Sequence, residues 1–130
     1  FSQRYAVADL GFEYKEARLQ DVKKRQNSIE VDNPELQAEW ERLQSNLAND
    51  AVDVYKWALD NGIAKEQARA VLPEGITTSR LYMQGTLRSW LHYIELRSGP
   101  ETQKEHREVA QACAQALESI FPMATEFLVK

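Results

Sequence analysis

Apolar residues recur every three or four positions through the middle of the chain, a spacing that predicts one long helix. The stripe consists of Leu36, Trp40, Leu43, Leu47, Val54 and Ala58, widened by Val52, Tyr55 and Leu59. Asn33 before Pro34 predicts the start of this helix, and Gly62 after Asn61 predicts its end. At 1.5 Å per residue the helix spans about 40 Å, more than a small domain needs. We therefore expect part of its stripe to pack against another chain or another domain.

Further elements follow this helix along the sequence. Residues 64–72 predict a short helix that Pro73 stops, and residues 77–83 predict a strand because they alternate polar and apolar positions and are rich in β-formers. Residues 87–97 predict a helix that ends before a Ser-Gly-Pro sequence. Its apolar stripe is Leu87, Trp90, Leu91 and Ile94. Arg97 lies at the edge of this stripe.

The two ends of the chain complete the expected fold. Thr102 and Glu105 form a T-x-x-E capping box, which predicts the start of a last helix. Its core stripe is expected to be Val109, Ala112, Cys113, Ala116, Leu117 and Ile120. Near the N-terminus, residues 11–20 predict an extended or strand segment and residues 21–28 a polar loop. These elements predict one domain, residues 1–130, that is mostly helical with a small amount of sheet.

The composition of the chain excludes some classes of function but does not identify one. The net charge of -4 argues against a broad nucleic-acid surface, which needs an excess of cations. The single cysteine, Cys113, cannot form an internal disulfide and predicts a reducing, cytoplasmic compartment. We expect no membrane contact, because no apolar run approaches the length that spans a bilayer.

Three arginines are candidates for binding an anion. Arg97 has two interpretations. It is either a cation that the helix dipole stabilises at the C-terminal end of the helix, or a rigid pair of hydrogen-bond donors. In the second case it would bind an anion or the negative charge that develops on a carbonyl oxygen. Arg69, between two alanines, is either solvated or crosses a cavity. Arg4 with Ser2 could hold a phosphate, whereas Ser2 as a nucleophile would lack an adjacent base. From the residues alone these alternatives stay open.

The remaining polar residues point less clearly to chemistry. His92 shares a helix flank with Arg88 and lies near Glu95, and we expect it to be a structural or surface group. His106 is expected to be solvated. Two histidines and one cysteine without metal-ligand spacing predict no metal site. The cationic run at residues 23–25 is most simply a solvated loop, although it could attract an anionic substrate.

Four segments, in order along the chain, resemble the flavin-dependent thymidylate synthases, the ThyX family. The first, "FSQRY", resembles the last five positions of the family signature R-H-R-x-x-S-x-N-E-x-S-x-R-Y and matches it at Ser2, Arg4 and Tyr5. "ARAVLP" is similar to the family's A-R-x-x-L-P. "TLRSWLHYIELRS" is similar to its N-x-R-S/A-(x)3-F-x-x-L/M-R helix, and "TQKEHREVA" is similar to the start of its closing helix.

The resemblance implies an activity and a place for each matching residue. The family methylates dUMP to dTMP with carbon from methylenetetrahydrofolate and a hydride from FAD that NADPH has reduced. The positions implied for dUMP are Phe1, Ser2, Gln3, Arg4, Arg69 and Arg97. Among them Arg97 is the implied catalytic residue, because it would face the uracil ring and favour its ionised form. Thr86, Leu87, Arg88 and His92 are the positions implied for the flavin.

The resemblance also implies a partner and a missing portion. The family forms homotetramers with shared active sites and has an α/β fold, and the Arg-His-Arg and Asn-Glu portion of its signature is absent here. We therefore expect the C-terminal part of a synthase, lacking the N-terminal flavin-binding portion and inactive alone. The family usually has Asn where this chain has Thr86. The alternatives from other classes are a non-catalytic nucleotide-binding module and a helical assembly domain.

Overall fold

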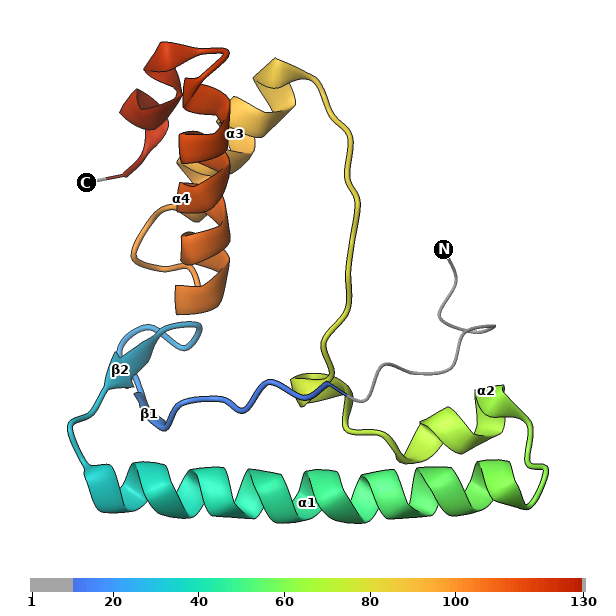
Figure 1. Ribbon diagram of the computed structural model, residues 1–130. Helices are drawn as coiled ribbons and strands as arrows, with labels where there is room; N and C mark the ends of the chain where they lie inside the picture. The colour runs from blue at the N-terminus through green and yellow to red at the C-terminus, as the bar shows by residue number, and fades with distance from the viewer. Residues whose placement is uncertain (1–10, 130) are drawn as a thin grey trace. The chain divides into compact units, whose positions relative to one another are not determined.

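The computed structural model describes residues 11–129, which form two compact units (Figure 1). The first unit contains residues 11–17 and 32–81, with helices α1 (Pro34–Asp60) and α2 (Lys65–Ala68) and the short 3-10 turns η1 (Arg69–Val71) and η2 (Glu74–Ile76). The second contains residues 18–31 and 82–129. Its elements are strands β1 (Arg18–Gln20) and β2 (Ser28–Glu30), helices α3 (Leu87–Arg97) and α4 (Lys104–Glu118), and η3 (Pro122–Phe127).

The long helix of the first unit begins and ends where the sequence predicts. The Asn33 side chain accepts a hydrogen bond from the Leu36 amide at 3.1 Å, and Pro34 occupies the first helical position. At the other end, Gly62 has φ of 75°, a conformation that glycine adopts without steric cost. Both predicted boundaries of α1 are therefore confirmed.

The face that α1 buries agrees with the predicted stripe only at Tyr55 and Ala58. Its buried residues are Gln44, Ala48, Ala51, Tyr55 and Ala58. Most of the large apolar residues of the predicted stripe are exposed in this chain, and Leu47 is 59% exposed. Small side chains let neighbouring segments approach the helix closely, which explains why the alanine-rich face is the covered one. Tyr55, Ala58 and the α2 residue Ala68 form the small core of this unit.

Two glutamines of α1 attach the extended N-terminal segment to the helix. Gln44 accepts a hydrogen bond from the Lys15 amide at 2.7 Å and donates one to the Lys15 carbonyl at 2.9 Å. Gln37 accepts one from the Ala17 amide at 2.6 Å. These contacts satisfy backbone groups that no strand pairs, and they fix residues 15–17 along α1.

Two predicted elements of this region are altered in the structure. The helix expected over residues 64–72 is shorter, because α2 passes into the η1 turn before Pro73. The strand expected over residues 77–83 is wrong: Thr77 forms an isolated bridge with Phe12, Thr78 donates to the Gly11 carbonyl, and residues 78–86 have no regular secondary structure. Tyr82 is 84% exposed, so no packing surface formed by residues 11–129 supports the alternating pattern.

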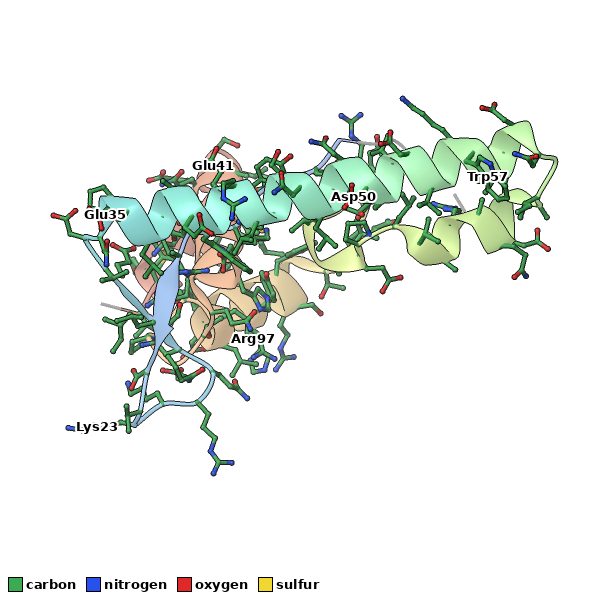
Figure 2. The ribbon with its side chains drawn as sticks, turned by 90° about the horizontal axis from the view of Figure 1, so that it is seen from below. Lys23, Glu35, Glu41, Asp50, Trp57 and Arg97 are labelled. Atoms are coloured by element: carbon green, nitrogen blue, oxygen red, sulfur yellow. The ribbon has the colours of Figure 1, made fainter. Side chains whose placement is uncertain are left out.

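The second unit contains a two-stranded hairpin. The antiparallel register pairs Arg18 with Glu30, Leu19 with Ile29, and Gln20 with Ser28. The loop between the strands is the polar loop that the sequence predicts, although Ser28 belongs to β2. Its shape comes from Asp21, whose carboxylate accepts hydrogen bonds from the Lys23 and Lys24 amides at 2.8 and 3.1 Å. Lys23 extends outward at the tip of this loop (Figure 2).

Ion pairs join the hairpin to the first turn of α4. Arg18 pairs with Glu105, and Lys104 pairs with Glu30. The predicted capping box is wrong for this reason: the Glu105 carboxylate faces Arg18, and α4 is capped at Gln103 without a side-chain hydrogen bond.

The buried face of α4 is also shifted from the predicted stripe. Ala110 and Ala114 are fully buried, and Cys113 and Leu117 are half-buried. Val109 and Ile120, both expected in the core, are exposed. The rest of the stripe, Ala112 and Ala116, is exposed too. Alanine permits close contact with α3 and η3, so it occupies the covered positions. Residues 11–129 are mostly helical with a little sheet, as predicted.

Within residues 11–129, no helix is long and apolar enough to cross a membrane.

Candidate functional site on α3

The start of α3 is defined by Thr86 and its neighbours. The Thr86 hydroxyl accepts a hydrogen bond from the Ser89 amide at 3.2 Å and lies 2.9 Å from the Ser89 hydroxyl. A side chain at Gly85 would lie 3.2 Å from the Trp90 indole nitrogen, so the glycine allows the indole to pack against the backbone. Threonine at position 86 therefore caps the helix.

One flank of α3 forms a pocket of about 400 Å³ with η3. Its lining residues are Arg88, Ser89, His92, Glu95 and Phe127. The four α3 residues lie on one face because a helix turns about 100° per residue. Two of the residues that the family resemblance implies for a flavin, Arg88 and His92, thus lie in one pocket.

The opposite flank of α3 carries Arg97 and an aromatic cluster. Trp90 and Tyr93 meet edge to face with ring centroids 5.9 Å apart, and Tyr93 lies 5.6 Å from the His106 ring of α4. Burial raises the pKa of the Tyr93 phenol, while the positive charge of Arg97 acts in the opposite direction. His106 is half-buried against Tyr93 and is not the solvated residue that the sequence predicts.

Both arginines of α3 are available to a ligand. Arg88 and Arg97 are exposed, and neither forms an ion pair with a carboxylate of the described residues. Nine residues separate them, which places their side chains half a turn apart on the helix. Ile94, fully buried, lies on the face that packs within the unit. One short helix can therefore present two separate cationic groups to two different ligands.

The remaining predicted residues lie elsewhere. Arg69 begins η1 in the first unit, half-buried and directly after the buried Ala68. The exposed Leu87 opens α3 beside the capping threonine. The four N-terminal positions, Phe1, Ser2, Gln3 and Arg4, lie outside the described residues. The structure thus gathers the residues implied for a flavin on α3, and it describes Arg69 and Arg97 in separate units.

Three pocket residues were not among the predicted site residues. Glu95 and Ser89 could have been found from helical spacing, since they share the face of Arg88. Phe127 carries no such signal, because its place depends on how η3 folds back on α3 and α4. No cluster of three or more histidine, cysteine, aspartate or glutamate side chains is placed to hold a metal ion anywhere in residues 11–129.

The chemistry of the pocket suits a ligand with an aromatic ring and an anionic group. An arginine offers planar donors to a phosphate, and a phenylalanine offers an apolar face to a ring. A carboxylate accepts hydrogen bonds from hydroxyl or amino groups. Nucleotides and dinucleotides carry all of these groups.

Comparison with known proteins identifies the family of this chain. The sequence profile of the family described as "Thymidylate synthase complementing protein" matches residues 1–123. A protein of Paramecium bursaria Chlorella virus 1, named "Probable flavin-dependent thymidylate synthase", is 42% identical over 98% of the chain. Proteins named "Flavin-dependent thymidylate synthase" are 46% identical over 94% of the chain in Synechocystis sp. and 31% identical over 95% in Thermus thermophilus.

The chain spans only part of the length of these relatives. It covers 59% of the viral protein, 56% of the Synechocystis protein and 44% of the Thermus thermophilus protein. The similarity therefore extends over almost the whole chain and over about half of each relative.

Proposed function

Since this chain belongs to the Thy1 family of thymidylate synthase complementing proteins, we propose that it is the C-terminal part of a flavin-dependent thymidylate synthase. In this proposal the complete protein methylates dUMP to dTMP. Methylenetetrahydrofolate is the carbon donor and NADPH is the reductant. The portion that precedes this part in a complete synthase supplies much of the flavin and nucleotide binding.

The residues of α3 are compatible with the flavin that the names of the relatives specify. FAD, when bound, supplies the hydride for the reaction. Arg88 and His92 line the pocket, and Leu87 and the Thr86 cap lie at the N-terminal end of α3. A pocket with an arginine, hydrogen-bonding side chains and an aromatic wall fits both the phosphates and the rings of this cofactor.

The nucleotide substrate belongs on the other flank. In our proposal Arg97 faces the uracil ring of dUMP, and its fixed positive charge stabilises the negative charge that develops on the pyrimidine. Arg69 contacts the nucleotide from η1, and Ser2 and Arg4 hold its phosphate together with the backbone near Phe1 and Gln3. One observation carries this assignment. Arg88 and Arg97 are both available and lie half a turn apart on α3, so in this proposal the cofactor and the substrate bind on different sides of one helix.

We further propose that the protein assembles as a homotetramer whose active sites are shared between subunits. The large apolar side chains along α1 support this proposal. They remain uncovered in the chain, and burying them against another subunit would remove apolar surface from water.

The test is turnover by the complete reading frame that contains these residues. We expect dTMP formation with FAD bound, detected by its visible absorbance, and a loss of about 100-fold or more in turnover for Arg97→Ala. Arg42→Ala is the matched control, because Arg42 is exposed and pairs only locally with Glu39. An unchanged rate in Arg97→Ala would contradict the role assigned to Arg97.

Ligand titration separates this proposal from the two alternatives. A non-catalytic nucleotide-binding module would bind dUMP without FAD. A helical assembly domain would bind neither compound. We expect the complete protein to bind both.

A further inference from the structure

Three consecutive cations occupy the loop between β1 and β2. Lys23, Lys24 and Arg25 are all exposed, and none of them forms an ion pair with a carboxylate of residues 11–129. Where the hairpin meets α4, by contrast, Arg18 and Lys104 each pair with a glutamate. Positive charge that no ion pair neutralises is therefore concentrated at the tip of the hairpin, in a chain whose net charge is -4.

Hydrogen bonds fix the backbone of this loop. The Asp21 carboxylate accepts hydrogen bonds from the Lys23 and Lys24 amides at 2.8 and 3.1 Å, and from the Asn27 side chain at 3.1 Å. The Asn27 amide donates to the Lys24 carbonyl at 3.0 Å, which closes a turn. A ligand that binds the three cations therefore does not have to order the loop backbone, and this lowers the entropic cost of binding.

The arrangement of donors favours one class of anion. Compact phosphate sites commonly use several backbone N–H groups that converge on one point. Here the Lys23 and Lys24 amides already donate to Asp21, so this part of the loop offers its cationic side chains instead. Side chains at successive positions point in different directions, and Lys23 extends outward at the tip (Figure 2). The loop thus suits several carboxylates along a flexible chain better than a single phosphate.

We propose that this loop binds the anionic tail of the folate co-substrate, a chain of γ-linked glutamates in which each residue adds one carboxylate. The inference rests on the proposed function, since it concerns the carbon donor of that reaction. Exposed ion pairs are individually weak and form without fixed geometry, which fits a co-substrate that enters and leaves in every turnover. The ligand assigned to this loop is distinct from the nucleotide and the flavin assigned to the arginines of α3 and η1.

Steady-state kinetics of the complete protein with monoglutamate and triglutamate forms of methylenetetrahydrofolate test the inference. We expect a KM about tenfold lower for the triglutamate, because several weak ion pairs add up along the tail. Raising the salt concentration should reduce this preference, since exposed charges are screened. The preference should disappear in the triple variant Lys23→Gln/Lys24→Gln/Arg25→Gln.

Two further variants show whether charge at this loop is the cause. A double variant that keeps the charge should retain the triglutamate preference: Lys23→Arg/Lys24→Arg. A triple variant that removes three exposed cations of α1 and α2 should also retain it: Arg42→Gln/Lys56→Gln/Lys65→Gln.

Three results would overturn the inference. If the protein forms dTMP with equal KM values for the two folates, or if the triple loop variant keeps the preference, the loop does not bind the tail and the proposed function stands. If the triple loop variant raises the KM for NADPH instead, the loop binds a phosphate of the reductant. If neither folate supports dTMP formation, both the inference and the proposed function are wrong.

Discussion

Gln44 is the residue that most directly joins the N-terminal segment to α1. It is 5% exposed and exchanges two hydrogen bonds with the backbone of Lys15. Its side-chain amide also donates to the Trp40 carbonyl at 3.3 Å. A buried amide that satisfies backbone groups is costly to remove, because its partners lose their hydrogen bonds without regaining water.

We therefore predict that Gln44→Leu destabilises the attachment of residues 15–17 by about 1–3 kcal/mol. Amide hydrogen exchange should be at least about fivefold faster at Lys15. Gln115→Leu on the exposed face of α4 is the control and should leave exchange at Lys15 unchanged. Equal exchange in both variants would mean that Gln44 does not hold the segment.

Asp21 is the residue that shapes the hairpin loop. Hydrogen bonds from the Lys24 and Lys23 amides, and then one from the Asn27 side chain, lower the pKa of the Asp21 carboxyl. Because the folded-state pKa lies below the unfolded value, the stabilisation is complete above the ordinary aspartate pKa. It is lost as the pH falls through the lowered value.

We predict that the Lys23 and Lys24 amides lose their hydrogen bonds only at a pH below the ordinary aspartate pKa. NMR titration of the Asp21 carboxyl and of these two amide shifts would follow the change. In Asp21→Asn the same amide shifts should be independent of pH in this range. A midpoint at or above the ordinary aspartate value would contradict the prediction.

At the scale of elements, α1 carries two adjacent faces with different roles. The buried face contacts the rest of its unit through small residues and Tyr55. The neighbouring face carries large apolar residues spaced alternately by four and three positions, as in a coiled-coil seam. These residues are Leu36, Trp40, Leu43, Leu47, Val54 and Trp57, with Asp50 at the one polar position of the series. Figure 2 follows this helix from Glu35 to Trp57.

We predict that Leu47→Glu, at the middle of this apolar seam, weakens the proposed self-association by at least about tenfold in dissociation constant, since a charge would be buried at the interface. Analytical ultracentrifugation of the complete protein measures the effect. Asn49→Glu places the same charge on an exposed position of α1 outside the seam and should leave assembly unchanged. A tetramer that tolerates Leu47→Glu would exclude this face as a subunit contact.

The helices also show which features of the fold could be predicted from the sequence and which could not. The ends of α1 were predictable because Asn33, Pro34 and Gly62 act on their own backbone. The covered faces of α1 and α4 were not, because hydrophobicity alone does not distinguish a surface that packs within the chain from one that remains uncovered. The Glu105 capping box was likewise overridden by an ion pair with Arg18, 87 positions away in the sequence.

At the scale of the whole molecule, the chain matches its relatives over about half of their length. The proposed nucleotide and flavin positions within it belong to two described units and to residues 1–4. In our proposal, residues of the preceding portion and of other subunits complete each site.

We therefore predict that residues 1–130 alone form no detectable dTMP, whereas the complete reading frame does. The reason is that catalysis requires substrate and cofactor to be positioned together, and in our proposal part of the binding residues belongs to the preceding portion of the synthase. Comparison of dTMP formation and FAD absorbance for the two proteins, at equal concentration, tests this. Full turnover by the 130 residues would contradict it.

The sequence by itself determined the ends of α1 and α3, the predominantly helical class and the family motifs, because each depends on residues that are close together in the chain. It also predicted that the two arginines of α3 face different sides, since helical geometry alone separates them by half a turn. The tertiary structure decided which helix faces are buried, the contact of His106 with Tyr93 and the place of Phe127 in the pocket. Those features depend on packing between distant segments, and no local pattern encodes which surfaces meet.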